Sequence, residues 1–243
     1  KSPDLQQAGD DVLRGVRSPF AADVAALLSE RTNDPGRRTV LYNLLASQLS
    51  GPWKEARSRE PVVRVIHAAL NSPEHRVQGV AMAEATGETR YRATLEALVV
   101  DRRQPIEVAV PAVEAIASLG GTPNRVLIRL IQDVRDKPES NELAEAAVRA
   151  LVKTFDARER LVSILTDRAY PTALRREALR TLVRVSEGAT QVIDLARSSK
   201  LPDDLKTEAT TALLALGDPR LREAAAAVLP PPATANGRPL PPL

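Results

Sequence analysis

The chain has 243 residues, a formal net charge of +3 from 34 basic and 31 acidic side chains, and no cysteine. This length suits one large domain or two small ones, and the balanced charge argues against a dedicated nucleic-acid binder. The lack of cysteine excludes disulfides, thiolate zinc sites and a cysteine nucleophile, and no apolar run is long enough to cross a membrane.

Aromatic residues make up only 2% of the chain, whereas 43% of all residues are apolar. The core must therefore be built from Leu, Val, Ile and Ala. Ala and Leu are strong helix formers, and the alternating pattern of strands is absent. Composition thus predicts an all-α protein.

Prolines recur along the chain at a nearly constant interval. Seven of them are separated by 32, 38, 32, 33, 33 and 31 residues, and these are Pro3, Pro35, Pro73, Pro105, Pro138, Pro171 and Pro202. Proline is favoured in the first turn of a helix, where its missing N–H would have no intrahelical partner. The spacing predicts one helix start per unit of about 33 residues, a period typical of helical solenoids.

Apolar residues behind these prolines follow steps of four, four and three. The stripes are Val108, Ala112, Ile116 and Leu119; Leu143, Ala147 and Leu151; Leu174, Ala178, Leu182 and Val185; and Leu205, Ala209, Leu213 and Leu216. This spacing is the buried face of an α-helix. The small Ala at the middle of each stripe allows a neighbouring helix to approach closely.

A second set of apolar segments lies between the first. We expect helices at Ala21–Arg31, Pro61–Leu70, Glu88–Asp101, Pro123–Arg135, Ala157–Asp167, Gly188–Ser199 and Pro219–Val228. Glycines at the short connections, such as 119–122 and 216–218, supply the left-handed residue that ends a helix. The sequence therefore predicts about 14 helices, arranged as six pairs with a half unit at each end.

The longest connection in this pattern is Ser50–Glu60, and it contains the only tryptophan, Trp53. A tryptophan in a loop can anchor a protein partner. It can equally pack the loop back onto the helices, and the sequence leaves both interpretations open.

Two successive units carry basic residues four apart, which places them on one helix face. They are Arg149 and Lys153 in one unit, together with Glu145, and Arg176, Arg180 and Arg184 in the next. Each lies two residues from the apolar stripe, about 200° around the helix, so it points away from the core. We expect the two rows to be neighbours on the concave side of the array, as a basic strip for an acidic partner. The alternative is a solvated face with Glu–Arg pairing.

Motifs for catalysis or cofactor binding are missing from the sequence. The two histidines, His67 and His75, lie on different predicted helices and are expected to be partly exposed, whereas a metal site needs three or four converging ligands. There is no nucleophile elbow and no glycine-rich phosphate loop. We therefore predict no catalytic, cofactor or metal site within these residues.

The last 14 residues, 230–243, differ from the rest, because six of them are proline. Such a segment favours an extended linker. We expect residues 1–229 to form the repeat domain, residues 230–243 to lead to a following domain, and the chain to be an internal segment of a longer protein.

The repeat itself resembles short bacterial HEAT repeats. The residues that carry the likeness are Ser72–Arg76, Leu174–Leu179 and Asp204–Ala209. The rival tetratricopeptide repeat is rejected because its Trp/Gly/Tyr signature is missing. The resemblance implies a HEAT-type solenoid, a right-handed α-α superhelix in which the second helix of each pair lines the concave side. Such a module acts as a non-catalytic scaffold for a protein or for a neighbouring domain.

A HEAT array followed by a proline-rich linker also resembles part of large bacterial dehydrogenase-like proteins. In those, the array lies between a propeller-type domain and a C-terminal c-type cytochrome. The resemblance implies haem c in the parent chain only, since Cys-x-x-Cys-His is absent here. It also implies a periplasmic or otherwise extracytoplasmic location; without it, a cytoplasmic one is the default.

Two other functions are compatible with this kind of fold. One is a HEAT-like DNA-repair glycosylase or another nucleic-acid-binding solenoid, which would need aromatic stacking surfaces that are scarce here. The other is a lyase-like protein that handles a tetrapyrrole, for which no particular residue argues. Fold alone does not decide between them.

Overall fold

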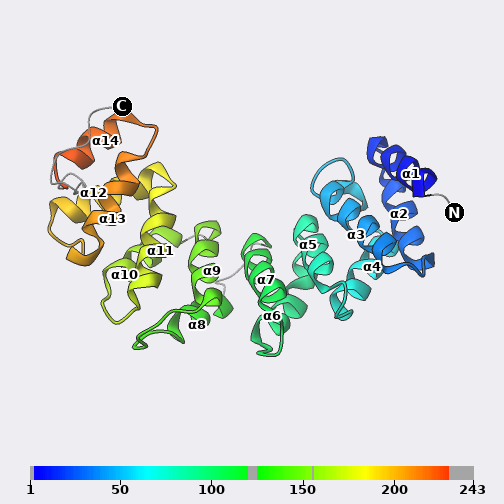
Figure 1. The fold of residues 1–243 in the computed structure, drawn as a ribbon, viewed down its shortest axis with the longest axis horizontal. Helices are drawn as coiled ribbons and strands as arrows, with labels where there is room; N and C mark the ends of the chain where they lie inside the picture. Colours follow the sequence, from blue (N-terminus) through cyan, green and yellow to red (C-terminus); the bar gives the residue numbers. More distant parts are fainter. Residues whose placement is uncertain (1–2, 120–124, 155, 230–243) are drawn as a thin grey trace. The chain divides into compact units, whose positions relative to one another are not determined.

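The chain is all-helical in the part that the computed structural model describes, residues 3–119, 125–154 and 156–229 (Figure 1). The α-helices are α1 (Pro3–Gly15), α2 (Pro19–Arg31), α3 (Pro35–Leu49), α4 (Glu60–Asn71), α5 (Arg76–Thr86), α6 (Arg92–Val100), α7 (Ile106–Ser118), α8 (Arg125–Gln132), α9 (Glu142–Ala150), α10 (Ala157–Thr166), α11 (Thr172–Val183), α12 (Ser186–Arg197), α13 (Lys206–Leu214) and α14 (Pro219–Ala226). Four short 3₁₀ helices accompany them: η1 (Lys54–Ala56), η2 (Thr89–Tyr91), η3 (Leu151–Lys153) and η4 (Asp203–Leu205). The predicted number of 14 helices is confirmed for these residues. The expected linker at 230–243 and the turn at 120–122 lie outside them.

The helices form two compact units, with α1–α7 in unit 1 and α8–α14 in unit 2. In unit 1, the odd-numbered helices pack in one row, α1 on α3, α3 on α5 and α5 on α7, and α2 packs on α4. The pairs α2–α3, α4–α5 and α6–α7 join the rows. In unit 2, α9, α11 and α13 form the odd-numbered row, α12 packs on α14, and α8–α9 and α10–α11 are the closest pairs.

Helix starts follow the prolines closely, although not at one fixed position. Pro35 is the first residue of α3, where Asp34 caps the helix by accepting from the N–H groups of the second and third residues. Pro105 is the residue just before α7. Pro138 lies outside its helix, because Asn141 caps α9 instead by accepting from the N–H of Ala144 at 2.8 Å.

The core consists mainly of the predicted aliphatic stripes. In α11, Leu174 and Ala178 are completely buried and Leu182 nearly so. Each leucine buried in this way contributes about 1.5–3 kcal/mol relative to an exposed one. The prediction is wrong for one residue of this stripe, Val185. It is exposed, because α11 ends at Val183 and Val185 already caps α12.

In two helix pairs, an arginine in the first turn of the second helix binds a carbonyl at the end of the preceding segment. In unit 1, Arg76 Nε donates to Leu70 O at 3.0 Å. In unit 2, Arg175 Nε donates to Tyr170 O at 3.2 Å, and its Nη2 donates to Asp204 of the next pair at 2.7 Å. Such bonds satisfy carbonyls that have no intrahelical donor. The equivalent roles of Arg76 and Arg175 also align α5 of unit 1 with α11 of unit 2.

No helix in the described ranges is long and apolar enough to cross a membrane.

Candidate interaction surfaces

The predicted basic residues of unit 2 do lie on the solvent side of the odd-numbered row. Arg176, Arg180 and Arg184 are exposed on α11, and Arg149 is half-buried on α9. Since α9 packs on α11, the two rows of basic residues are neighbours, as the helical phase predicts. That these residues line the concave side of an array stays a prediction.

A glutamate that the sequence analysis missed joins these two rows. Glu177 has a side chain only 11% exposed, and its two carboxylate oxygens lie 3.8 Å from Arg149 Nη1 and 3.9 Å from Arg180 Nη1. A carboxylate this buried needs such partners, because an isolated buried charge is strongly unfavourable. Glu177 therefore holds α9 and α11 together through opposite charge.

A second glutamate, Glu208 on α13, repeats the arrangement one helix further. It receives Arg180 Nη2 at 2.7 Å and Arg176 Nε at 3.1 Å. Glu177 and Glu208 thus pair with the central arginines of the expected basic strip, as in the alternative of a solvated face with Glu–Arg pairing. The missed signal was the glutamate directly before the stripe alanine in both Glu177-Ala178 and Glu208-Ala209.

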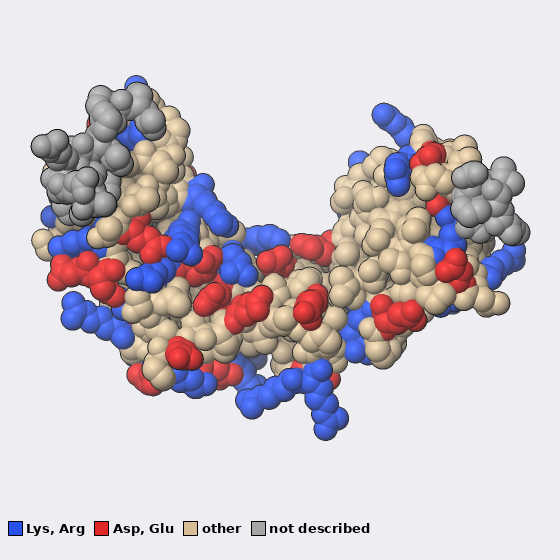
Figure 2. All heavy atoms as spheres, in the orientation of Figure 1, with Lys and Arg blue, Asp and Glu red and all other residues tan. Residues whose placement is uncertain are grey.

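The ends of the two rows differ from their centre. Arg184 lies at the C-cap of α11 and has no ion-pair partner in the described part of the chain. Lys153 is exposed at the end of η3. Figure 2 shows acidic and basic side chains interspersed over unit 2. What the row presents to solvent is an alternating charge pattern.

Trp53 is not available to a partner, which corrects one of the two interpretations of its loop. The side chain is 0% exposed, and its indole Nε1 donates to Val16 O at 2.7 Å. A buried tryptophan satisfies its N–H in this way. Trp53 therefore fastens the Ser50–Glu60 connection to the segment after α1 and is removed from the candidate binding residues.

Unit 1 carries a groove over α3, α5 and α7 with a volume of about 690 Å³. Its lining residues are Asn43, Ala46, Ser47, Ser50, Arg57, Ala81, Glu84, Ala85, Gly87 and Ser118. Most of them are small and uncharged, and the surface over α3 is correspondingly free of charge in Figure 2. The charged residues are already engaged: Arg57 donates to Leu49 O at 2.7 Å, and Glu84 accepts from Ser118 Oγ at 2.8 Å.

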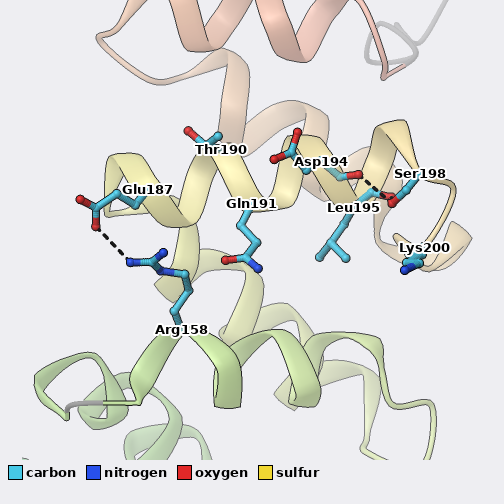
Figure 3. Close-up of a pocket in the computed structure, with 8 residues that line it drawn as sticks. All are labelled: Arg158, Glu187, Thr190, Gln191, Asp194, Leu195, Ser198 and Lys200. Atoms are coloured by element: carbon cyan, nitrogen blue, oxygen red, sulfur yellow. Dashed lines mark hydrogen bonds and ion pairs between the residues drawn. The ribbon is translucent and has the colours of Figure 1, made fainter.

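A smaller depression of about 490 Å³ lies between α10 and α12 (Figure 3). Arg158 and Glu187 close one end at 3.5 Å, and Lys200 lies at the other end, with Gln191 and Leu195 pointing toward α10 between them. Its lining charges are balanced, with two basic and two acidic side chains once Asp194 is included. The depression therefore has no preference for a ligand of either sign.

The two histidines contact different aromatic residues. His75 is buried with its ring edge-on to Tyr42 at 5.3 Å, contrary to the expectation of a partly exposed residue, because it packs between α3 and α5. His67 is exposed and lies beside Tyr91, 5.3 Å between ring centres. Within the described ranges, no three His, Asp or Glu side chains come together as metal ligands would.

Together these observations define an all-α protein of paired helices. The sequence matches no protein-family model. No curated protein matches it either.

Proposed function

We propose that the chain is a HEAT-type solenoid and acts as a non-catalytic scaffold that presents the odd-numbered helices of unit 1 to a protein partner or a neighbouring domain. The observation that carries this proposal is the nearest-neighbour packing within each unit. The main contacts of every helix are with helices one or two places away along the chain. Packing of this kind is the hallmark of repeat arrays, and it leaves one face of each row open for binding.

The groove over α3, α5 and α7 is the surface best suited to that role. Small side chains such as Ala81 and Ser47 let a partner's backbone approach closely, and three successive helices contribute to one continuous surface. Because Arg57 and Glu84 are already hydrogen-bonded, a neutral segment of a partner meets little desolvation cost there.

The solenoid part of the proposal is tested by small-angle X-ray scattering. A compact globule of this length has a radius of gyration of about 18 Å. A solenoid of six helix pairs is elongated and should exceed that value clearly. A measured value at the globular limit would contradict the proposal.

The binding role is tested with a photo-crosslinking amino acid at Ala81, which is exposed in the groove, and at Ala68, which is exposed on α4. A protein captured from Ala81 only is then purified and titrated against matched variants. Ala81→Arg should weaken its binding at least about tenfold, since a bulky charge would fill the groove, and Ala68→Arg should not. Equal effects of the two variants would contradict a role for the groove.

A scaffold role is favoured over base excision from nucleic acid by one observation on the same face. The described odd-numbered helices carry a single aromatic residue, Tyr42, and its side chain is 4% exposed. An enzyme that extrudes a base needs exposed stacking surfaces.

The position within a larger extracytoplasmic electron-transfer protein belongs to the proposal as well. There the array would separate a propeller-type domain from a c-type cytochrome domain. Haem staining of the full-length protein from its natural source tests it: a haem-containing band larger than 26.3 kDa is expected, and a product without haem would contradict it.

A further inference from the structure

The outer face of α2 carries large apolar side chains in solvent. Phe20 is 65% exposed, Val24 44%, Leu27 38% and Leu28 41%. Their spacing of four, three and one places them within about 100° of one helix face. With Val12 of α1 and Val16 just after it, half of the twelve exposed large hydrophobics among the described residues fall between residues 12 and 28. Exposed apolar residues scattered singly are ordinary, but a cluster of this kind marks a binding surface.

This helix has the reverse of the usual distribution of side-chain size. Toward the core, α2 buries only small residues, among them Ala22 and Ala25. Its neighbour α4 is ordinary, with Val65 and Ile66 buried and Arg64 exposed. Burial of large apolar side chains drives helix packing, yet the larger apolar face of α2 stays mostly in solvent. Its first residue, Phe20, is partly covered by Arg59, whose Cζ lies 4.7 Å from the centre of the ring.

One flank of α2 is already occupied by α4 and its N-terminal segment. The carboxylate of Asp23 receives Arg59 Nε at 2.8 Å, and Glu30 receives Arg64 Nε at 2.6 Å. The hydrogen bond from Arg64 holds the pKa of Glu30 below its usual value. Both acidic groups on this helix are therefore neutralised by the next pair of helices.

The charges that remain beside the apolar face are basic. Arg17 precedes α2 and Arg31 ends it, both are exposed, and neither forms an ion pair with another described residue. Arg31 acts on Glu30 only by longer-range attraction. A second copy of this chain is a poor occupant, because antiparallel pairing of two α2 helices would bring Arg17 near Arg31, and parallel pairing would bring each arginine near its own copy.

We propose that this face, formed by Phe20, Val24, Leu27 and Leu28, binds an amphipathic α-helix of a partner protein whose apolar stripe is flanked by acidic residues. The helix would lie on the outer face of α2, next to the flank that α4 and Arg59 occupy. Its apolar stripe would cover the exposed side chains, and its carboxylates would face Arg17 and Arg31. This surface is distinct from the groove of unit 1, so neither proposal depends on the other.

The test uses synthetic peptides of about 18 residues, long enough for five helical turns, with Leu at helical spacing and Glu on both flanks. A matched peptide carries Lys in place of Glu. Fluorescence anisotropy with the full chain should show the Glu peptide binding at least about tenfold more tightly than the Lys peptide at low salt. The difference should shrink at about 0.5 M NaCl, because the rim charges are exposed and screened.

Three variants locate the site. The double change Val24→Glu and Leu28→Glu should weaken Glu-peptide binding at least about tenfold, whereas Val100→Glu, at a 58% exposed valine on α6, should leave it unchanged. Arg31→Glu should reduce or reverse the preference for Glu over Lys flanks without disturbing the fold, and circular dichroism verifies helicity for each variant.

Four results would overturn the proposal. They are no binding of the Glu peptide up to about 1 mM, equal affinity for both peptides, and equal sensitivity to the α2 and α6 variants. The fourth is occupancy by something else: binding to vesicles of phosphatidylcholine and phosphatidylserine that the α2 variant abolishes, or sedimentation as a dimer that the same variant dissociates.

Discussion

Helices α5 and α11 perform the same packing role in the two units yet present different surfaces. We compare the two helices by aligning Arg76 with Arg175. At the exposed or half-exposed positions, Val77 then corresponds to Arg176, Ala81 to Arg180 and Ala85 to Arg184. Unit 1 therefore presents small neutral residues over a groove, and unit 2 presents charges that bridge neighbouring helices.

The difference shows which positions the packing controls. The core side of both helices is constrained to close contact, with Gly79 in α5 and Ala178 in α11 at equivalent places. The solvent side has no such constraint, so it is free to differ between units of one chain. A neutral groove suits direct contact with a partner's apolar or backbone groups. The ion pairs of Glu177 and Glu208 with nearby arginines, which we call the charge ladder, mainly strengthen the packing of the odd-numbered helices.

The largest expected effect is the loss of close packing in either unit. An added Cβ at Gly79 would lie 2.6 Å from the backbone N of Leu70, and one at Gly188 would lie 2.3 Å from Leu182 O. Backbone atoms cannot move aside as a flexible side chain does, so Gly79→Ala and Gly188→Ala should each lower the free energy of unfolding by about 2–3 kcal/mol.

Urea unfolding measures this effect and separates the two units. Fluorescence of Trp53, the single tryptophan, reports on unit 1, and circular dichroism reports on both. Gly79→Ala should shift the Trp53 transition. Gly9→Ala, where nothing lies within 4 Å of the added Cβ, is the control and should destabilise neither unit, since Ala is a better helix former than Gly. An unchanged free energy of unfolding in Gly79→Ala would show that α4 and α5 pack less closely in solution than they do in this structure.

The next effect tests the charge ladder of unit 2. Glu177→Gln keeps the shape of the side chain but leaves Arg149 and Arg180 without their shared carboxylate, so it should lower the free energy of unfolding by about 1–2 kcal/mol. Gln78→Ala, at the corresponding position of unit 1, involves no ion pair and should cost less. Chemical unfolding of both variants at low and high salt measures the difference. An equal loss of unfolding free energy in Glu177→Gln and Gln78→Ala would mean that the ion pairs of Glu177 add nothing to stability.

Acid should affect unit 2 more than unit 1. Hydrogen bonds from Arg175 and Arg160 lower the pKa values of Asp204 and Asp156, and the backbone N–H of Ala169 does the same for Asp167. A lowered folded-state pKa gives stability that is present above the unfolded value of 3.8 and is lost as pH falls through the folded value. Stability should therefore fall as pH drops from about 5 to below 3.8, by about 1 kcal/mol or less for exposed pairs.

Asp204→Asn provides the matched comparison for this pH dependence. It removes the titrating group that pairs with Arg175, so the variant should be less stable at neutral pH and should lose less stability on acidification. Thermal unfolding followed by circular dichroism across the pH range checks this. An unchanged slope of stability against pH would contradict the assignment.

The smallest expected effect is a difference in stability between variants of two exposed arginines, Arg180 on α11 and Arg184 at its C-cap. Arg180→Glu places a carboxylate beside Glu177 and Glu208, and should cost about 0.5 kcal/mol, with the cost decreasing as salt rises. Arg184→Glu breaks no ion pair with a described residue and should be close to neutral. Equal melting temperatures for the two variants would indicate that the ion pairs of Arg180 are not formed in solution.

Local patterns were enough to predict the helices themselves. A proline or capping residue at the start and an apolar residue every three or four places act within a single helix, so they can be read without knowing its neighbours. The starts of α3, α4 and α14 and the stripe Leu174, Ala178 and Leu182 follow from such patterns.

Only the tertiary structure decided what the side chains meet. The indole of Trp53 binds a carbonyl 37 residues away, Glu177 pairs with an arginine one helix pair back, and Phe20 points outward because alanines fill the core side of α2. The same residue types could have faced solvent, a partner or the core. Their roles depend on which helices pack together, and that is set by the sum of many contacts rather than by any local motif.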